Sequence, residues 1–189
     1  MEKFRIKDRT LDSSQIAYIA EVKKLTDKIT ETKGERPKYF SHTYGCQQNE
    51  NDTERMNGFL DKMGFEQTKD KDNADIILFN TCAVRENAEL KVFGYIGALK
   101  NIKAQRPDML IGICGCMIQQ KHIAEKIKKT YEHVDMVFGT HSLYRFPEIM
   151  YNSMNNRIFD IEDADGYIAE DMPHLRTNSV TATVSVMYG

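Results

Sequence analysis

The chain has 189 residues, of which 41% are apolar, and this suits one compact domain with some peripheral segment better than two independent cores. Its 26 basic and 28 acidic residues give a formal net charge of −2, which excludes a surface that would hold nucleic acid by charge alone. The N-terminus lacks the apolar core of a signal peptide, and no stretch is long enough to span a membrane. We therefore expect a cytoplasmic protein without membrane contact.

Residues 1–36 are expected to form an N-terminal helical extension. Apolar residues recur at roughly helical spacing between Asp12 and Thr30, which predicts one amphipathic helix. Asp12 and Gln15 have the spacing of a capping box at the start of that helix. Gly34 then breaks the helical pattern before the first predicted strand.

Residues 37–161 alternate between short apolar strands and amphipathic helices. The expected strands are 38–44, 74–80, 109–114, 134–138 and 157–161. The expected helices are 52–63, 84–104, 119–131 and 143–152. Nearly continuous apolar strands separated by helices indicate a parallel sheet that is covered on both faces. We predict an α/β domain, an open parallel sheet of about four to five strands in a flavodoxin-like or Rossmann-like three-layer sandwich.

The C-terminal part of the sequence has a different character. Residues 162–179 are acidic and rich in turn-forming residues, which is typical of a linker. Residues 180–189 are strongly β-prone, but no helix or partner strand follows them in the sequence. We expect this unpaired strand to be disordered, to self-associate or to dock on the domain's own sheet.

The four cysteines, at positions 46, 82, 114 and 116, are too sparse for a secreted disulfide scaffold of this size. Cys46, Cys82 and Cys116 each follow a predicted strand, and they are separated by 36 and 34 residues, close to one βαβ step. Each such step returns the chain to the same edge of a parallel sheet. We therefore expect these three thiols to converge at the carboxyl edge, where open α/β sheets bind ligands.

The surroundings of these three thiols suit metal binding. Each thiol precedes a predicted helix, whose N-terminal amides favour the thiolate that ligates metals. A small residue (Gly45, Thr81 or Gly115) stands before each cysteine, and we interpret it as room for the backbone to approach a bulky inorganic centre. Three thiolates suit an iron–sulfur cluster with one iron left open. A structural zinc site with all four thiols is an alternative, and for Cys114 we favour a packing role.

Other candidate groups carry weaker signals. The five histidines show no metal-ligand spacing, and no glycine fingerprint for nucleotide binding occurs. The same fold would also serve a zinc-stabilised domain, a thiol-redox domain or a small-ligand domain without cysteine chemistry. Some polar residues beyond the first two cysteines are either hydrogen-bond partners around a metal or residues of ordinary helix starts. These are Gln47, Asn49, Arg85 and Glu86.

The cysteine motifs resemble those of a known family. They read Tyr-Gly-Cys-Gln-Gln-Asn-Glu-Asn-Asp-Thr-Glu at 44–54, Asn-Thr-Cys-Ala-Val-Arg-Glu at 80–86 and Gly-Cys-Met at 115–117. They look like the motifs in the N-terminal domain of radical-SAM methylthiotransferases. Their wording is closest to the MiaB type, which modifies tRNA, rather than to the relatives that modify a ribosomal protein. The resemblance covers residues 38–189.

The resemblance implies that Cys46, Cys82 and Cys116 hold an auxiliary 4Fe-4S cluster and that Cys114 lies outside the ligand set. The full-length enzyme would be a transferase that methylthiolates carbon two of isopentenyl-modified adenosine beside the tRNA anticodon. In such an enzyme a radical-SAM barrel binds a second 4Fe-4S cluster and S-adenosylmethionine, and a TRAM domain binds RNA.

The sequence departs from the family pattern at its end. The family's C-x-x-x-C-x-x-C motif would begin directly after Gly189, so the barrel and the TRAM domain are absent from these residues. Residues 180–189 then correspond to the first strand of a truncated barrel. We expect the chain alone to be inactive and to bind the tRNA anticodon stem-loop weakly.

Overall fold

A computed structural model describes residues 10–83, 86–161 and 171–176. The strands are β1 (Lys38–Tyr44), β2 (Glu66–Gln67), β3 (Ile76–Thr81), β4 (Leu110–Cys114), β5 (Met136–Phe138) and β6 (Ile158–Asp160). The α-helices are α1 (Ser13–Lys33), α2 (Gln47–Lys62), α3 (Glu86–Gln105), α4 (Lys121–Thr130) and α5 (Phe146–Ser153). Three short 3-10 helices are η1 (Lys71–Asn73), η2 (Cys116–Gln119) and η3 (Thr140–Arg145).

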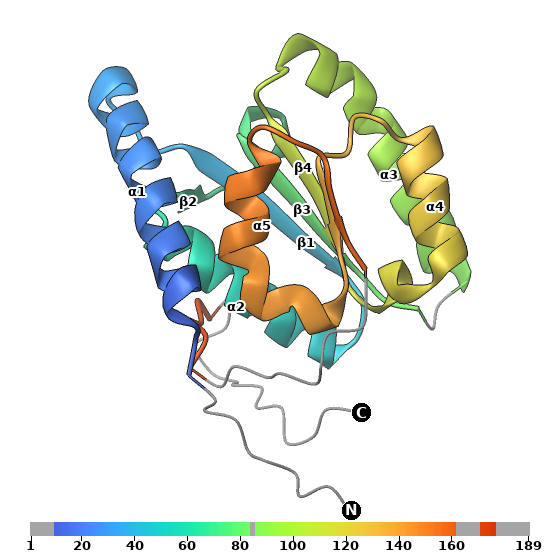
Figure 1. Ribbon diagram of the computed structural model, residues 1–189. Helices are drawn as coiled ribbons and strands as arrows, with labels where there is room; N and C mark the ends of the chain where they lie inside the picture. Colours follow the sequence, from blue (N-terminus) through green and yellow to red (C-terminus); the bar gives the residue numbers. More distant parts are fainter. Residues whose placement is uncertain (1–9, 84–85, 162–170, 177–189) are drawn as a thin grey trace, which may run out of the picture.

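The six strands form one parallel sheet in the order β2-β1-β3-β4-β5-β6, with helices on both faces (Figure 1). α2 and α5 cover one face, around a core that includes Phe59, Phe138 and Phe146. α3 and α4 cover the other face, around a core that includes Ile96 and Ile127. This architecture confirms the predicted three-layer α/β fold. The sheet has six strands, one more than the upper number predicted. The additional strand is β2, whose two exposed residues carry no apolar pattern.

The five predicted strands are confirmed, with ends that shift by one or two residues. The largest difference is at α2, which begins at Gln47 rather than near residue 52. Its first turn contains polar residues without apolar periodicity. Cys46 caps this turn, and the side chain of Asn49 accepts a hydrogen bond from the Cys46 N–H at 3.2 Å.

The long helix α1 packs along α5, with Val22 in the core. Asp12 caps α1 as predicted, because its carboxylate accepts a hydrogen bond from the N–H of Ser14 at 2.8 Å. Gln15 does not complete the predicted capping box. Instead its amide donates to the carboxylate of Glu148 at 3.3 Å and its oxygen accepts from the Glu148 N–H at 3.2 Å. These contacts join the start of α1 to α5.

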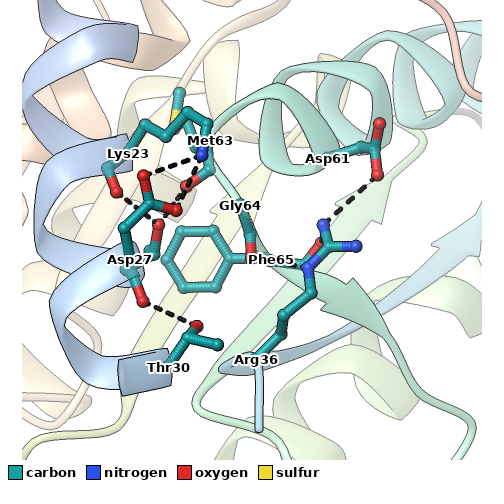
Figure 2. A network of polar contacts seen from close by, with 9 residues as sticks. Lys23, Asp27, Thr30, Arg36, Asp61, Met63, Gly64 and Phe65 are labelled. Carbon is teal, nitrogen blue, oxygen red and sulfur yellow. Dashed lines mark hydrogen bonds and ion pairs between the residues drawn. The ribbon is translucent and has the colours of Figure 1, made fainter. Parts of the chain in front are cut away.

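The turn between α2 and β2 is held against α1 and the start of β1 by polar contacts (Figure 2). Arg36 donates from Nε to the carbonyl of Gly64 at 2.9 Å and from Nη2 to the carbonyl of Phe65 at 2.5 Å. The hydroxyl of Thr26 donates to the carbonyl of Met63 at 2.5 Å. Gly64 has a φ of +93°, and a Cβ atom there would collide with the Thr26 hydroxyl. These contacts fix the amino end of the sheet.

Residues 171–176, which we call the strap, lie within the predicted linker but pack against α2. Met172 is buried in the core beside α2, and the N–H of Leu175 donates to the carbonyl of Glu54 at 2.9 Å. A Cβ atom on Gly58 would lie 2.6 Å from the strap backbone, so glycine allows this close approach. The packed chain therefore extends past residue 161.

The predicted strand at 180–189 and its predicted self-association lie outside the described residues, as do Arg85 and most of the predicted linker. In the part of the chain that the structure describes, no helix combines the length and the apolar character that a membrane span needs.

Candidate functional site

Three cysteines lie where neighbouring strands end. Cys46 follows β1 and caps α2, Cys82 follows β3, and Cys116 opens η2 after β4. Because β1, β3 and β4 are adjacent and parallel, these positions share the carboxyl edge of the sheet, which we call the cysteine edge. The strand order reverses between β1 and β3, and ligands bind at such a point in sheets of this topology.

The three thiols differ in exposure and influence one another. Cys46 is exposed, Cys116 is half-buried and Cys82 is buried. Burial raises the pKa of the Cys116 thiol, and the nearby thiols of Cys82 and Cys46 raise that pKa further. The direction is opposite to the predicted effect of a helix N-terminus. The physical reason is that η2 is a short 3-10 turn, whose amides do not offset burial and neighbouring thiols.

Within residues 10–83, 86–161 and 171–176, no group of three or more His, Cys, Asp or Glu side chains is arranged to hold a metal ion. The chemistry of the cysteine edge nevertheless suits a metal centre. A bound cation would relieve the repulsion between thiolates that raises the pKa of Cys116. The exposure of Cys46 leaves the edge accessible to a bulky group. Thiolate sulfur is a suitable donor for an iron–sulfur cluster, and Cys46, Cys82 and Cys116 are the residues that would supply it at this edge.

Cys114 lies in the core rather than at the cysteine edge. Its side chain is buried, and its sulfur lies 3.6 Å from the sulfur of Met56 on α2. Burial raises the pKa of Cys114 well above its usual range, and the nearby carboxylate of Asp52 adds to this shift. A zinc site with all four thiols would require Cys114 to leave this packed position.

Gly45 and Gly115 make room for neighbours other than the one we predicted. A Cβ atom on Gly45 would lie 2.5 Å from Cγ of Asn49, and one on Gly115 would lie 2.5 Å from Oδ1 of Asn80. Gly115 also has a φ of +105°, which an L side chain rarely adopts. The groups that require glycine are therefore parts of the protein itself, namely the side chain of Asn49 at Gly45 and the backbone of Thr81 with the side chain of Asn80 at Gly115.

These amides belong to a buried set of hydrogen bonds, the amide network, formed by Asn49, Thr53 and Asn80. Asn49 donates to Oδ1 of Asn80 at 2.9 Å. Asn80 donates in return to the backbone carbonyl of Asn49 at 2.8 Å and to the Thr53 hydroxyl at 3.1 Å. Both asparagines are almost fully buried. The network therefore joins the first turns of α2 to the end of β3.

The amide network reaches the cysteine edge directly. Oδ1 of Asn49 accepts hydrogen bonds from the N–H of Cys46 at 3.2 Å and from its thiol at 3.3 Å. On the other side, the hydroxyl of Thr81 donates to the carbonyl of Cys114 at 2.8 Å and so links β3 to β4. Sequence reasoning considered Asn49 but missed Asn80. The signal that pointed to Asn80 was an amide inside an otherwise apolar strand.

Asp52 of α2 is a buried carboxylate near the cysteine edge. Gln48 donates to its Oδ1 at 2.9 Å, and Arg55 lies 3.9 Å from the same oxygen. Burial raises the pKa of Asp52 to about 6, and the opposing effects of Arg55 and Gln48 are smaller. The charge of Asp52 also contributes to the raised pKa of Cys116.

We expect Asp52→Asn to remove a pH dependence of stability. The folded state keeps a proton on Asp52 up to about pH 6, whereas the unfolded chain releases it near pH 3.8. The free energy of unfolding therefore falls as the pH rises through this window, by on the order of 1–3 kcal/mol. Urea denaturation at pH values below and above the window measures the effect, with the exposed substitution Asp108→Asn as control. An unchanged pH profile in Asp52→Asn would contradict this assignment.

Comparison with known proteins finds related sequences over most of the chain. The family model "Uncharacterized protein family UPF0004" matches residues 38–139, which include β1 to β5 and all four cysteines. The chain is 47% identical over 177 residues to the tRNA-2-methylthio-N(6)-dimethylallyladenosine synthase of Acetivibrio thermocellus, covering 93% of this chain and 37% of the relative. It is 42% identical over 177 residues to the protein of that name from Clostridioides difficile, with the same coverage.

The synthase of the same name from Alkaliphilus oremlandii is 47% identical over 174 residues, or 89% of this chain and 37% of the relative. The chain thus spans about 37% of the length of these curated relatives. The family match covers more than half of the chain and contains the whole cysteine edge. The chain therefore belongs to the family UPF0004.

Proposed function

We propose that this chain is the cluster-binding part of a tRNA methylthiotransferase. The observation that carries the proposal is the placement of Cys46, Cys82 and Cys116 at one edge of the sheet, with Cys114 packed in the core. In this proposal the three thiolates hold an auxiliary 4Fe-4S cluster. When bound, the cluster supplies an iron without a protein thiolate, at which sulfur for the transfer can be held.

The chain's own residues hold the thiols in place. Asn49 binds the backbone and the thiol of Cys46, and Asn80 holds Asn49. Gly115 allows the backbone before Cys116 to pass close to Asn80. In this proposal Cys114 is not a ligand, and its burial in the core supports that assignment. Hydrogen bonds between protein groups thus position the thiols, and these bonds do not require a metal.

For the whole protein we extend the proposal in line with the names of the relatives. The reaction is methylthiolation at carbon two of isopentenyl-modified adenosine beside the tRNA anticodon, in the cytoplasm. S-adenosylmethionine and a second 4Fe-4S cluster would be bound outside these 189 residues, because the chain contains no C-x-x-x-C-x-x-C motif. We therefore propose that the chain alone is inactive and binds tRNA weakly.

The test is anaerobic reconstitution of the chain with iron and sulfide, followed by metal counting and Mössbauer spectroscopy. We expect about four irons per chain in the parent protein, from the stoichiometry of a 4Fe-4S cluster. The single variants Cys46→Ser, Cys82→Ser and Cys116→Ser should lose the cluster because each removes one thiolate ligand. Cys114→Ser is the matched control, since it changes a thiol in the same region that lies in the core.

Failure of the parent chain to form a cluster would overturn the proposal, and so would either of two other outcomes. One is a Cys114→Ser variant that loses the cluster as completely as Cys46→Ser. The other is a colourless protein that binds one zinc with all four thiols, which would favour the zinc-stabilised alternative. A cluster that depends only on the three edge thiols would support the proposal and exclude the zinc-stabilised alternative.

A further inference from the structure

A row of aromatic rings follows β1 toward the cysteine edge. Phe40, His42 and Tyr44 occupy every second position of β1 and therefore share one face of the strand. Their ring centroids are 6.3 Å apart between Phe40 and His42 and 4.4 Å apart between His42 and Tyr44. Tyr95 of α3 continues the row, with its centroid 5.5 Å from that of Tyr44 and its plane inclined by 25°. We call these four residues the aromatic stripe.

The aromatic stripe has an inner side that packs against the core, through Phe40 and Tyr44, and an outer side that is exposed to solvent. Tyr95 is 48% exposed, His42 is exposed, and Phe40 and Tyr44 are half-buried. β2 pairs only with the first two residues of β1, so in the described part of the chain no strand covers the outer edge of β1 beyond Tyr39. The rings of His42 and Tyr95 are therefore accessible, and those of Phe40 and Tyr44 are partly accessible from the free edge of β1.

The aromatic stripe is continuous with the cysteine edge. Tyr44 precedes Cys46 by two residues, and its carbonyl accepts a hydrogen bond from the N–H of Cys82 at 3.0 Å. A ligand that lies on the stripe is thus directed to the ends of β1 and β3.

The composition of the stripe favours unpaired nucleobases over an aliphatic partner. Exposed aromatic rings bind bases by stacking, and each stacked base contributes about 1–3 kcal/mol. Lys91 is exposed one helical turn before Tyr95 and supplies a positive charge beside the stripe for a phosphate. The net charge of −2 indicates that base stacking rather than charge would dominate this contact.

We propose that the aromatic stripe is a stacking surface for unpaired bases of single-stranded RNA and leads them to the cysteine edge. The choice of RNA rests on the function proposed above, because a tRNA adenosine must then reach this edge. The placement of the surface rests on the ring geometry and exposure alone.

The test is fluorescence anisotropy of a labelled single-stranded oligoadenylate titrated with this chain. Tyr95→Ala and His42→Ala should each weaken binding about tenfold or more, since each removes a stacking ring. Tyr95→Phe should retain the affinity because the ring remains. Ile16→Ala is the matched control, because Ile16 is an exposed apolar residue on α1, 58% exposed and outside the stripe.

The same probe separates this proposal from the proposed function. A Cys46→Ser, Cys82→Ser, Cys116→Ser triple variant should bind the oligonucleotide as the parent does, because stacking needs no metal. Failed cluster reconstitution together with ring-dependent RNA binding would refute the metal site and leave the stripe intact. No binding by the parent chain, equal binding by parent and Tyr95→Ala, or equal binding of a duplex RNA would overturn the stripe proposal, and a protein partner would then be the better occupant.

Discussion

Replacing Gly115 by alanine is expected to lower the free energy of unfolding by about 3 kcal/mol or more. Gly115 has a φ of +105°, so any L side chain is strained there. A Cβ atom would also lie 2.7 Å from the backbone nitrogen of Thr81 and 2.5 Å from Oδ1 of Asn80. Backbone of a buried strand cannot move aside as a flexible side chain does. Urea denaturation of parent and variant measures the loss.

Gly94→Ala is the matched control for this substitution. Gly94 lies within α3, and a Cβ atom there would have no neighbour within 4 Å, so alanine meets no obstacle. The helix propensity of alanine should raise stability by about 0.5–1 kcal/mol. A Gly115→Ala variant whose stability stayed within about 0.5 kcal/mol of the parent would contradict the close packing of β3 and β4 described at the cysteine edge.

Asn80→Leu is expected to lower the free energy of unfolding by about 3 kcal/mol, although the two side chains are similar in size. The substitution leaves the Asn49 amide with only its longer bond to the carbonyl of Thr81, at 3.4 Å, and removes a donor to Thr53. Both asparagine positions have almost no solvent access. Unpaired buried polar groups cost about 1–3 kcal/mol each. The rate of amide hydrogen exchange at Cys46 should also rise, because Asn49, which accepts from the Cys46 N–H, loses its bond to Asn80. Urea denaturation and hydrogen exchange together measure both effects.

The control is the substitution of an exposed asparagine, Asn155→Ala, which should change stability by less than about 0.5 kcal/mol. A double-mutant cycle with Asn49→Ala and Asn80→Ala tests whether the two amides act together. Their combined effect should be smaller than the sum of the single effects, because either change already breaks the bond between them. Additive effects would show that the amide network is not a unit.

The sequence was sufficient to predict those parts of the fold that have a periodic signature. The apolar runs around β3 and β4 predict buried parallel strands, and the spacing of Cys46, Cys82 and Cys116 predicts their arrival at one edge. β2 could not be predicted in this way, because its two residues are exposed and gain their place only through backbone pairing with β1. The early start of α2 depends likewise on capping by Asn49, and not on an apolar pattern.

The positions of the three thiols could be predicted, but the hydrogen bonds and close contacts that hold them could not. The alternation of strands and helices in the sequence indicates a parallel sheet, and a parallel sheet brings the three thiols to one edge. The bond between Asn49 and Asn80 joins residues 31 positions apart and follows from no local preference. For the same reason the sequence suggests an inorganic centre beside Gly45 and Gly115, whereas their close neighbours are protein groups far away in the sequence or on the next turn. The raised pKa of Cys116 depends on burial, which spacing does not reveal.

The amide network has a consequence for the energetics of metal exchange. In small domains that fold only around an ion, the free energy of metal binding is also the free energy of folding, and chelation unfolds them. Here the fold has two apolar cores, and Asn49 and Asn80 hydrogen-bond to each other. These interactions stabilise the domain and involve no metal. If the proposed cluster binds at the cysteine edge, it would add its binding free energy to a fold that already has its own cores. Chelation is then expected to lower the free energy of unfolding of the loaded domain without unfolding it.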